Sequence, residues 1–153
     1  MNREEILGQL RAAKAAHVSW VQRAKMLIEG FSINESSIPV NSTECAFGKW
    51  FYSDGQRLND IRNNPVSAMT EIEDLHFKLH DIYMNIFKIY YDTEKKGFFS
   101  KMFGKKKKVN DEGRATAKKF FDEMEGVSKE LVQALNTMER RINVVNGAEI
   151  DAL

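Results

Sequence analysis

The sequence predicts an all-α fold, an antiparallel four-helix-bundle-like domain with three long helices and one or two short ones. Apolar residues recur at steps of three and four over three long segments, which is the period of an amphipathic helix. Only two prolines and nine glycines interrupt the 153 residues. Hydrophobic residues make up 42% of the chain, enough for one core at this length. We therefore expect residues 1–153 to form a single helical domain.

The first long helix is expected from about Glu4 to Glu29. Gly30 follows it and suits a left-handed helix cap. The stripe that predicts this helix consists of Ile6, Leu10, Ala13, His17, Trp20 with Val21, Ala24, and Leu27 with Ile28. One face of the helix is thus expected to be buried, with His17 within that face.

Residues 32–41, which include Pro39, are expected to form a loop. Ser42 or Thr43 then suits the N-cap of a short helix that runs to about Tyr52, where Asp54-Gly55 breaks it. A second short helix is expected over 56–62.

Two further long helices are expected. Asn64-Pro65 suits the start of the first of them, which should fade near Lys96-Gly97. Its stripe is Val66, Met69, Ile72, His76, Leu79, Tyr83, Ile86 with Phe87, and Tyr90. The last helix should begin near Asn110-Asp111 and close at Asn146-Gly147. Its apolar face, which includes Phe120, Leu131 and Ile142, carries no candidate metal ligand.

The composition favours a soluble, cytoplasmic protein. One cysteine cannot form an internal disulfide. The N-terminal residues are polar and acidic, unlike those of a signal peptide. No apolar run approaches the about 18 residues of a membrane span.

The net charge of +1 hides an uneven distribution. Residues 95–108 carry seven lysines and no acid, and removing these charges leaves −6 for the rest. Within the basic connection, residues 97–109, four apolar side chains (Phe98, Phe99, Met102 and Phe103) adjoin Lys105, Lys106, Lys107 and Lys108. This composition is that of an interfacial anchor, so an anionic membrane surface is one expected partner. A solvated loop is the alternative, and nucleic acid is not expected.

The three histidines and the cysteine are the candidate metal ligands: His17, Cys45, His76 and His80. Neutral imidazole and thiolate are the usual ligands of a closed tetrahedral zinc site, and four of them complete it. His76 and His80 are one helical turn apart, so their rings point to the same side of a helix. The sequence therefore predicts bound Zn2+.

Each of these residues also has a purely structural interpretation. A lone histidine on an apolar face is more often a core residue with its ring nitrogens satisfied, and a free cysteine is often a small buried hydrophobe. However, we expect Cys45 in the first turn of its short helix, where backbone N–H groups favour thiolate. Gly48 is interpreted as a point of close approach by Trp50 or a neighbouring helix.

Other metal centres fit less well. A haemerythrin-like di-iron site needs more histidines, and a carboxylate di-metal bundle needs a second copy of Glu73-x-x-His76. The main rival to a non-enzymatic zinc site is a zinc hydrolase with three histidine ligands and an open position. Such an enzyme would require that a water molecule replace Cys45 at the metal, and that a residue such as Glu44 or Glu73 act as the general base. A membrane-docking structural adaptor is a third alternative.

Three segments resemble the bacterial chemoreceptor zinc-binding domains: 17–20 (His-x-x-Trp), 45–50 (Cys-x-Phe-Gly-x-Trp) and 76–80 (His-x-x-x-His). The resemblance implies a helical bundle, often dimeric, that holds zinc through three histidines and one cysteine. It also implies a sensory role, responding to zinc or to hypochlorous acid through the zinc-bound thiolate. Such domains are usually fused to a chemoreceptor signalling hairpin or a diguanylate cyclase, and this sequence contains neither motif.

The sequence thus predicts a non-enzymatic zinc-binding regulatory module for signal transduction. We expect a homodimer that acts in trans on a signalling protein, such as a chemoreceptor or a cyclic-di-GMP enzyme, unless the chain is an excised domain.

Overall fold

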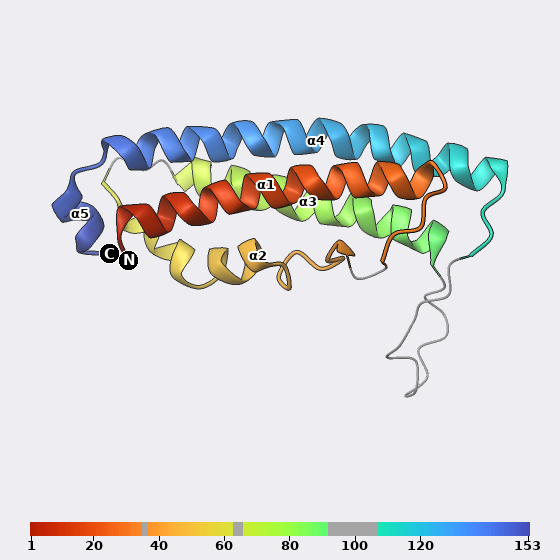
Figure 1. Cartoon of the computed structure of the whole chain (residues 1–153). Helices are drawn as coiled ribbons and strands as arrows, with labels where there is room; N and C mark the ends of the chain where they lie inside the picture. The colour runs from red at the N-terminus through yellow and green to blue at the C-terminus, as the bar shows by residue number, and fades with distance from the viewer. Residues whose placement is uncertain (35–36, 63–65, 92–106) are drawn as a thin grey trace.

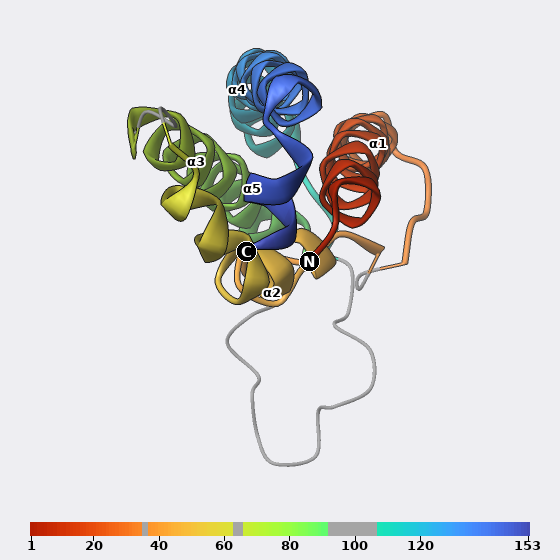
Figure 2. The same cartoon turned by 90° about the vertical axis from the view of Figure 1, so that its left-hand side faces the viewer.

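The computed structural model describes residues 1–34, 37–62, 66–91 and 107–153. Its long helices are α1 (Arg3–Ile28), α3 (Val66–Tyr90) and α4 (Asp111–Val144). The short elements are α2 (Ala46–Phe51), the 3-10 helix η2 (Asp54–Asp60) and α5 (Gly147–Asp151). Successive segments run in alternating directions along the molecule (Figure 1). The end view shows α1, α3 and α4 around a common axis, with α2 and η2 in the fourth corner (Figure 2). The predicted antiparallel bundle is confirmed.

The first long helix follows its sequence signals closely. The side chain of Asn2 accepts a hydrogen bond from the Glu5 N–H, and the Glu5 carboxylate accepts one from the Asn2 N–H, which forms a capping box. Beyond its C-terminal end, Gly30 has a φ of 95°, the left-handed conformation that glycine adopts without strain. His17 lies within the buried stripe of this helix, fully removed from solvent.

The short helix begins later than predicted. Its N-cap is Cys45 itself, whose Sγ accepts a hydrogen bond from the Gly48 N–H at 3.1 Å. Ser42 and Thr43 therefore do not cap it, because the chain makes separate turns before Cys45. The second short segment, η2, covers 54–60 and is a 3-10 helix rather than an α-helix.

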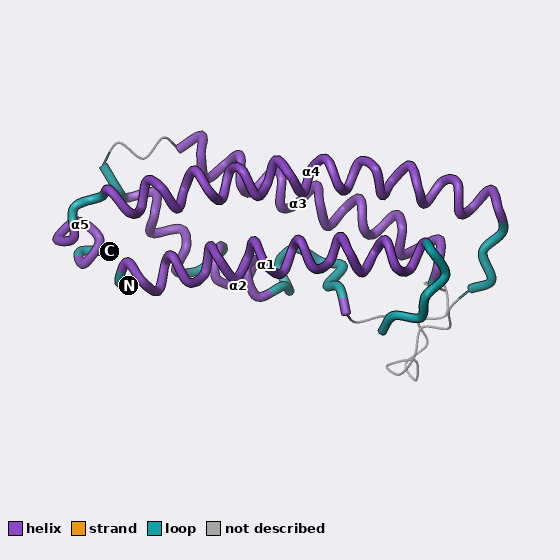
Figure 3. The backbone as a smooth tube through the Cα atoms, turned by 45° about the horizontal axis from the view of Figure 1, so that its top comes forward, coloured by secondary structure: helices purple, strands orange, loops and turns teal. Residues whose placement is uncertain are grey.

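The last two long helices confirm the predicted stripes, apart from Val66, whose side chain lies outside the described part of the chain, and they correct two ends. Helix α3 ends at Tyr90, earlier than the predicted Lys96-Gly97, and the residues beyond 91 lie outside the described part until 107. The predicted Asn64-Pro65 start also lies outside it. Helix α4 begins after its predicted cap, Asn110. Asn146 does not close the fold, because its side chain caps the further helix α5. Figure 3 shows α5 folded back across one end of the bundle.

A continuous core runs between the long helices. Its largest fully buried side chains come from every described helix except α5: Tyr83, Phe51, Ile6, Leu10, Leu27, Leu58, Ile72, Leu79, Ile86, Met124 and Leu131, with Ile38 from the loop. No helix within the described ranges is both long and apolar enough to cross a bilayer. At the surface, the Glu139 carboxylate of α4 accepts hydrogen bonds from Arg11 and Lys14 of α1, which link the two helices there.

Candidate metal centre

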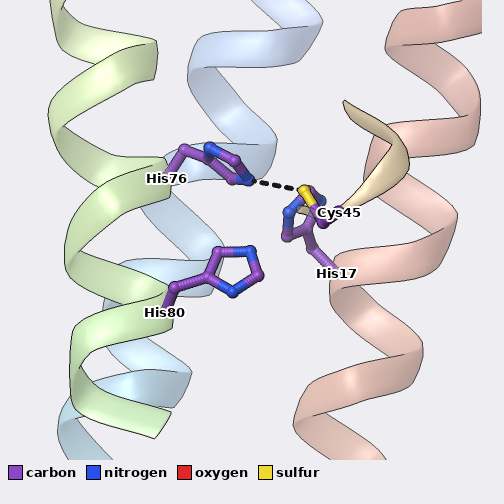
Figure 4. A group of neighbouring side chains, drawn as sticks. All are labelled: His17, Cys45, His76 and His80. Atoms are coloured by element: carbon purple, nitrogen blue, oxygen red, sulfur yellow. Dashed lines mark hydrogen bonds between the residues drawn. The ribbon is translucent and has the colours of Figure 1, made fainter. Parts of the chain in front are cut away.

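The four predicted ligands come together inside the bundle. His17 projects from α1, His76 and His80 from α3, and Cys45 from the start of α2 (Figure 4). Their candidate ligand atoms all lie within 4.8 Å of one another, and all four residues are buried. Three separate segments therefore converge on one point, and the short segment that completes the bundle supplies the sulfur.

Two of the histidines are held in the same way. Nδ1 of His17 lies 2.6 Å from the carbonyl oxygen of Ala13, and Nδ1 of His80 lies 2.7 Å from that of Pro39. A carbonyl only accepts, so each neutral ring must carry its proton on Nδ1. The Nε2 lone pairs are thus free, and neither buried Nε2 atom has a hydrogen-bond partner among the described residues. Fixing the tautomer through the other ring nitrogen is how proteins orient histidine ligands of metals.

His76 and Cys45 face each other directly. Sγ of Cys45 lies 3.2 Å from Nε2 of His76 and 3.2 Å from the carbonyl oxygen of Ser42. Without a metal, the single S–H proton can serve only one of these acceptors. The Nδ1 atom of His76 is buried and has no hydrogen-bond partner within the described part of the chain. In contrast to the other two rings, His76 is oriented by no backbone carbonyl of the described residues.

Burial keeps the histidines neutral. It lowers the pKa of His17 to about 4, although the bond to the Ala13 carbonyl opposes the shift. It lowers the pKa of His76 to about 2, with further lowering from His17 and His80. The pKa of His80 is also lowered by burial. At neutral pH the three rings are therefore uncharged, and each has a lone pair available for a metal.

The pKa of the Cys45 thiol differs in direction from the one that the sequence predicts. Burial raises its pKa, and this outweighs the lowering by the N–H groups of Gly48 and Phe47 and by the charge of Lys49. The predicted contributions that favour thiolate at the helix start are present, but burial outweighs them. A cation held by the four clustered ligand atoms would favour ionisation of this sulfur.

The residues present fit a zinc ion. Tetrahedral coordination with bonds of about 2.0–2.3 Å separates sulfur and nitrogen ligands by about 3.5 Å, close to the 3.2 Å between Cys45 and His76. A buried polar atom without a partner costs about 1–3 kcal/mol, and a bound cation would satisfy the Nε2 atoms of His17 and His80. Three imidazoles and one thiolate are a donor set that zinc favours.

Two aromatic residues enclose the cluster. The ring of Trp20 lies 4.5 Å from that of His17 and 5.3 Å from that of His80, measured between centroids. Phe47 packs edge-on against His76 at 5.1 Å. The sequence motifs include both aromatic residues, but the motifs alone did not predict that these rings pack against the candidate ligands. The contact of His80 with the Pro39 carbonyl had no sequence signal, whereas Ala13 lies one helical turn before His17.

Comparison with known proteins agrees with this geometry. Residues 17–87 match the family model of the chemoreceptor zinc-binding domain, and this range contains all four clustered residues. The predicted resemblance is confirmed, and it supports a zinc-binding sensory module. No curated protein and no solved structure gives a significant match to the chain.

Proposed function

We propose that this chain, whose residues 17–87 match the model of the chemoreceptor zinc-binding domain, is a non-enzymatic zinc-binding sensory module that responds to zinc or to oxidants. The observation that carries the proposal is the burial of four candidate ligand atoms within 4.8 Å of one another. His17, Cys45, His76 and His80 would hold the ion. Bound zinc would supply the positive charge that keeps the Cys45 sulfur ionised.

The position of Cys45 supports an oxidant response. Of the four candidate ligands, Cys45 alone lies outside the long helices, so a bound ion would link the start of α2 to the three histidines through this sulfur atom. A thiolate is oxidised by hypochlorous acid in the balanced reaction RS− + HOCl → RSOH + Cl−. A sulfenic acid at Cys45 adds an oxygen between Ser42, Gly48 and His76, which all lie within 3.2 Å of the sulfur. We expect this crowding to displace α2 from the bundle.

Two features disfavour the hydrolase alternative. The sulfur of Cys45 lies within the cluster, where an open coordination position would be needed. Glu73, one of the two residues suggested as a general base, instead interacts with Tyr52.

The oligomeric state and the signalling partner belong to the same proposal. We propose a cytoplasmic homodimer that acts in trans on a signalling protein, with helix packing as the transmitted change. Docking through Lys105 to Lys108 stays a prediction, since most of the basic connection lies outside the described residues.

Oxidation of the zinc-loaded protein tests the proposal. Brief treatment with substoichiometric hypochlorous acid should modify Cys45 before the seven methionines, release zinc, and change the fluorescence of Trp20. The Trp50→Phe variant isolates the Trp20 signal, and Cys45→Ser is the matched control that should not respond. Mass spectra that show methionine sulfoxide first, with Cys45 intact, would make the site structural rather than sensory.

A further inference from the structure

A pocket of about 300 Å³ opens at the end of the bundle where α4 turns into α5. It lies between the last turns of α4, the α4–α5 turn and the residues that follow η2. Its lining includes none of the four candidate metal ligands. The pocket therefore needs an explanation separate from the metal centre.

The pocket has an apolar floor. Ile61, Met138 and Ile142 line it, and each is at most 5% exposed, so these side chains belong to the core. Val144 lies at the rim and is 84% exposed. A ligand that covered this floor and rim would gain about 25 cal/mol for each Å² of apolar surface removed from water.

Two arginines give the pocket its charge. Arg62 and Arg141 both line it, and neither side chain forms an ion pair with a described residue. Nη1 of Arg141 is buried and has no hydrogen-bond partner in the described ranges. Leaving a charged donor buried and unpaired is costly. An anionic ligand that reached the Arg141 guanidinium would therefore supply an acceptor that the described residues do not supply to Nη1.

The neighbouring groups reinforce the positive charge. Arg3 donates to the carbonyl of Val145, which lines the pocket, and its buried Nε has no partner among the described residues. Glu149, the one acidic group among the described lining residues, accepts a hydrogen bond from the backbone N–H of Arg62. The described lining thus has two guanidinium groups and one carboxylate, which is already bonded.

We infer that this pocket binds a small organic monocarboxylate with an apolar body. The ligand's carboxylate accepts hydrogen bonds from Arg141 and Arg62, since a guanidinium matches a carboxylate in a planar, two-bonded geometry. Its apolar body covers Met138 and Ile142. Inorganic phosphate fits less well, because it cannot cover the apolar floor and its second charge is repelled by Glu149.

Titration of the full chain with benzoate tests this inference. In spectra of methyl-labelled protein, the Met138 signal should shift saturably. The Met124 signal should not, because Met124 lies about 20 Å away along α4. Benzamide, the neutral analogue, should cause no saturable shift. A peptide with a free C-terminal leucine forms a second arm, and tighter binding than benzoate would support the site and identify a chain terminus as its source.

Matched variants separate the site from general charge effects. Arg141→Gln should weaken benzoate binding by about ten-fold or more, which is the loss expected for a charged hydrogen bond. Arg140→Gln removes the same charge from a residue that bonds to Thr137 and does not line the pocket, and should bind as wild type. Arg62→Gln provides an independent test if Arg141→Gln unfolds. Equal shifts with benzamide, no saturable Met138 shift, or unchanged binding by both pocket variants would overturn the inference.

Discussion

The backbone N–H of Gly48 donates a hydrogen bond to the sulfur of Cys45 at 3.1 Å. The same glycine packs against the loop that precedes Cys45, since a Cβ on Gly48 would lie 1.8 Å from the carbonyl oxygen of Ser42. That carbonyl is in turn 3.2 Å from the cysteine sulfur. One position thus controls both the cap of α2 and the placement of its candidate ligand. The predicted close approach at Gly48 is correct, but the neighbour is Ser42 rather than Trp50 or another helix.

We therefore predict that Gly48→Ala destabilises the protein and weakens zinc binding. The Ser42 backbone would have to move, and overpacking of this kind costs about 1–3 kcal/mol. Gly8→Ala is the control, because a Cβ there meets nothing within 4 Å. It should stabilise α1 by about 0.5–1 kcal/mol. Urea unfolding and chelator competition measure both effects, and equal behaviour of the two variants would refute the role of Gly48.

Removal of single ligands should weaken metal binding while the bundle stays folded. Cys45→Ala, His76→Ala and His80→Ala each delete one candidate ligand, whereas the core on the long helices remains. Ile72→Val, one turn before His76 on α3, should cost about 0.5–1.5 kcal/mol and leave zinc affinity unchanged. Competition against a chromogenic chelator, with circular dichroism as the folding control, provides the measurement. Full zinc retention by all three alanine variants would place the site elsewhere.

His76→Leu should have opposite effects with and without metal. Leucine removes the buried Nδ1 that has no partner among the described residues, and relieving such a group is worth about 1–3 kcal/mol. The metal-free variant should therefore melt at a higher temperature than metal-free wild type, but gain less from added zinc. Lower stability of the variant in the metal-free state would show that His76 has a structural role of its own.

The sequence predicted the clustering of the four candidate ligands better than it predicted the structure around them. His17 and His76 interrupt apolar stripes of regular helical period, so their burial and inward direction followed from spacing alone. The N-cap role of Cys45 could not be predicted in this way, because Ser42 and Thr43 are better N-caps by residue type. The helix begins after Cys45 because Gly48 packs closely against Ser42, a contact that the sequence does not reveal. The raised pKa of Cys45 also depends on burial by distant segments.

Stability should depend on pH through Glu139, whose pKa is lowered by hydrogen bonds from Lys14 and Arg11. A carboxylate with a lowered folded-state pKa stabilises the fold above its unfolded pKa, and this contribution is lost as the pH falls through the folded pKa. Glu139→Gln should therefore cost up to about 1 kcal/mol at pH 7 and progressively less in acid.

Glu123→Gln is the matched control on the same helix. Glu123 pairs with Lys78 at 3.5 Å, and both side chains are at least half exposed, so we expect almost no change at either pH. Urea unfolding at neutral and acidic pH compares the variants. A Glu139→Gln effect that grows as the pH falls would contradict the prediction.

Metal analysis combined with X-ray absorption of the purified full chain tests the central claim most directly. Protein prepared without chelators should contain one zinc per chain, with one sulfur ligand near ~2.3 Å and three nitrogen ligands near ~2.0–2.1 Å. The Cys45→Ala variant should lose the sulfur signal. Absence of zinc from the wild-type protein, or a zinc shell of oxygen and nitrogen alone, would contradict the assignment of His17, Cys45, His76 and His80 as its ligands.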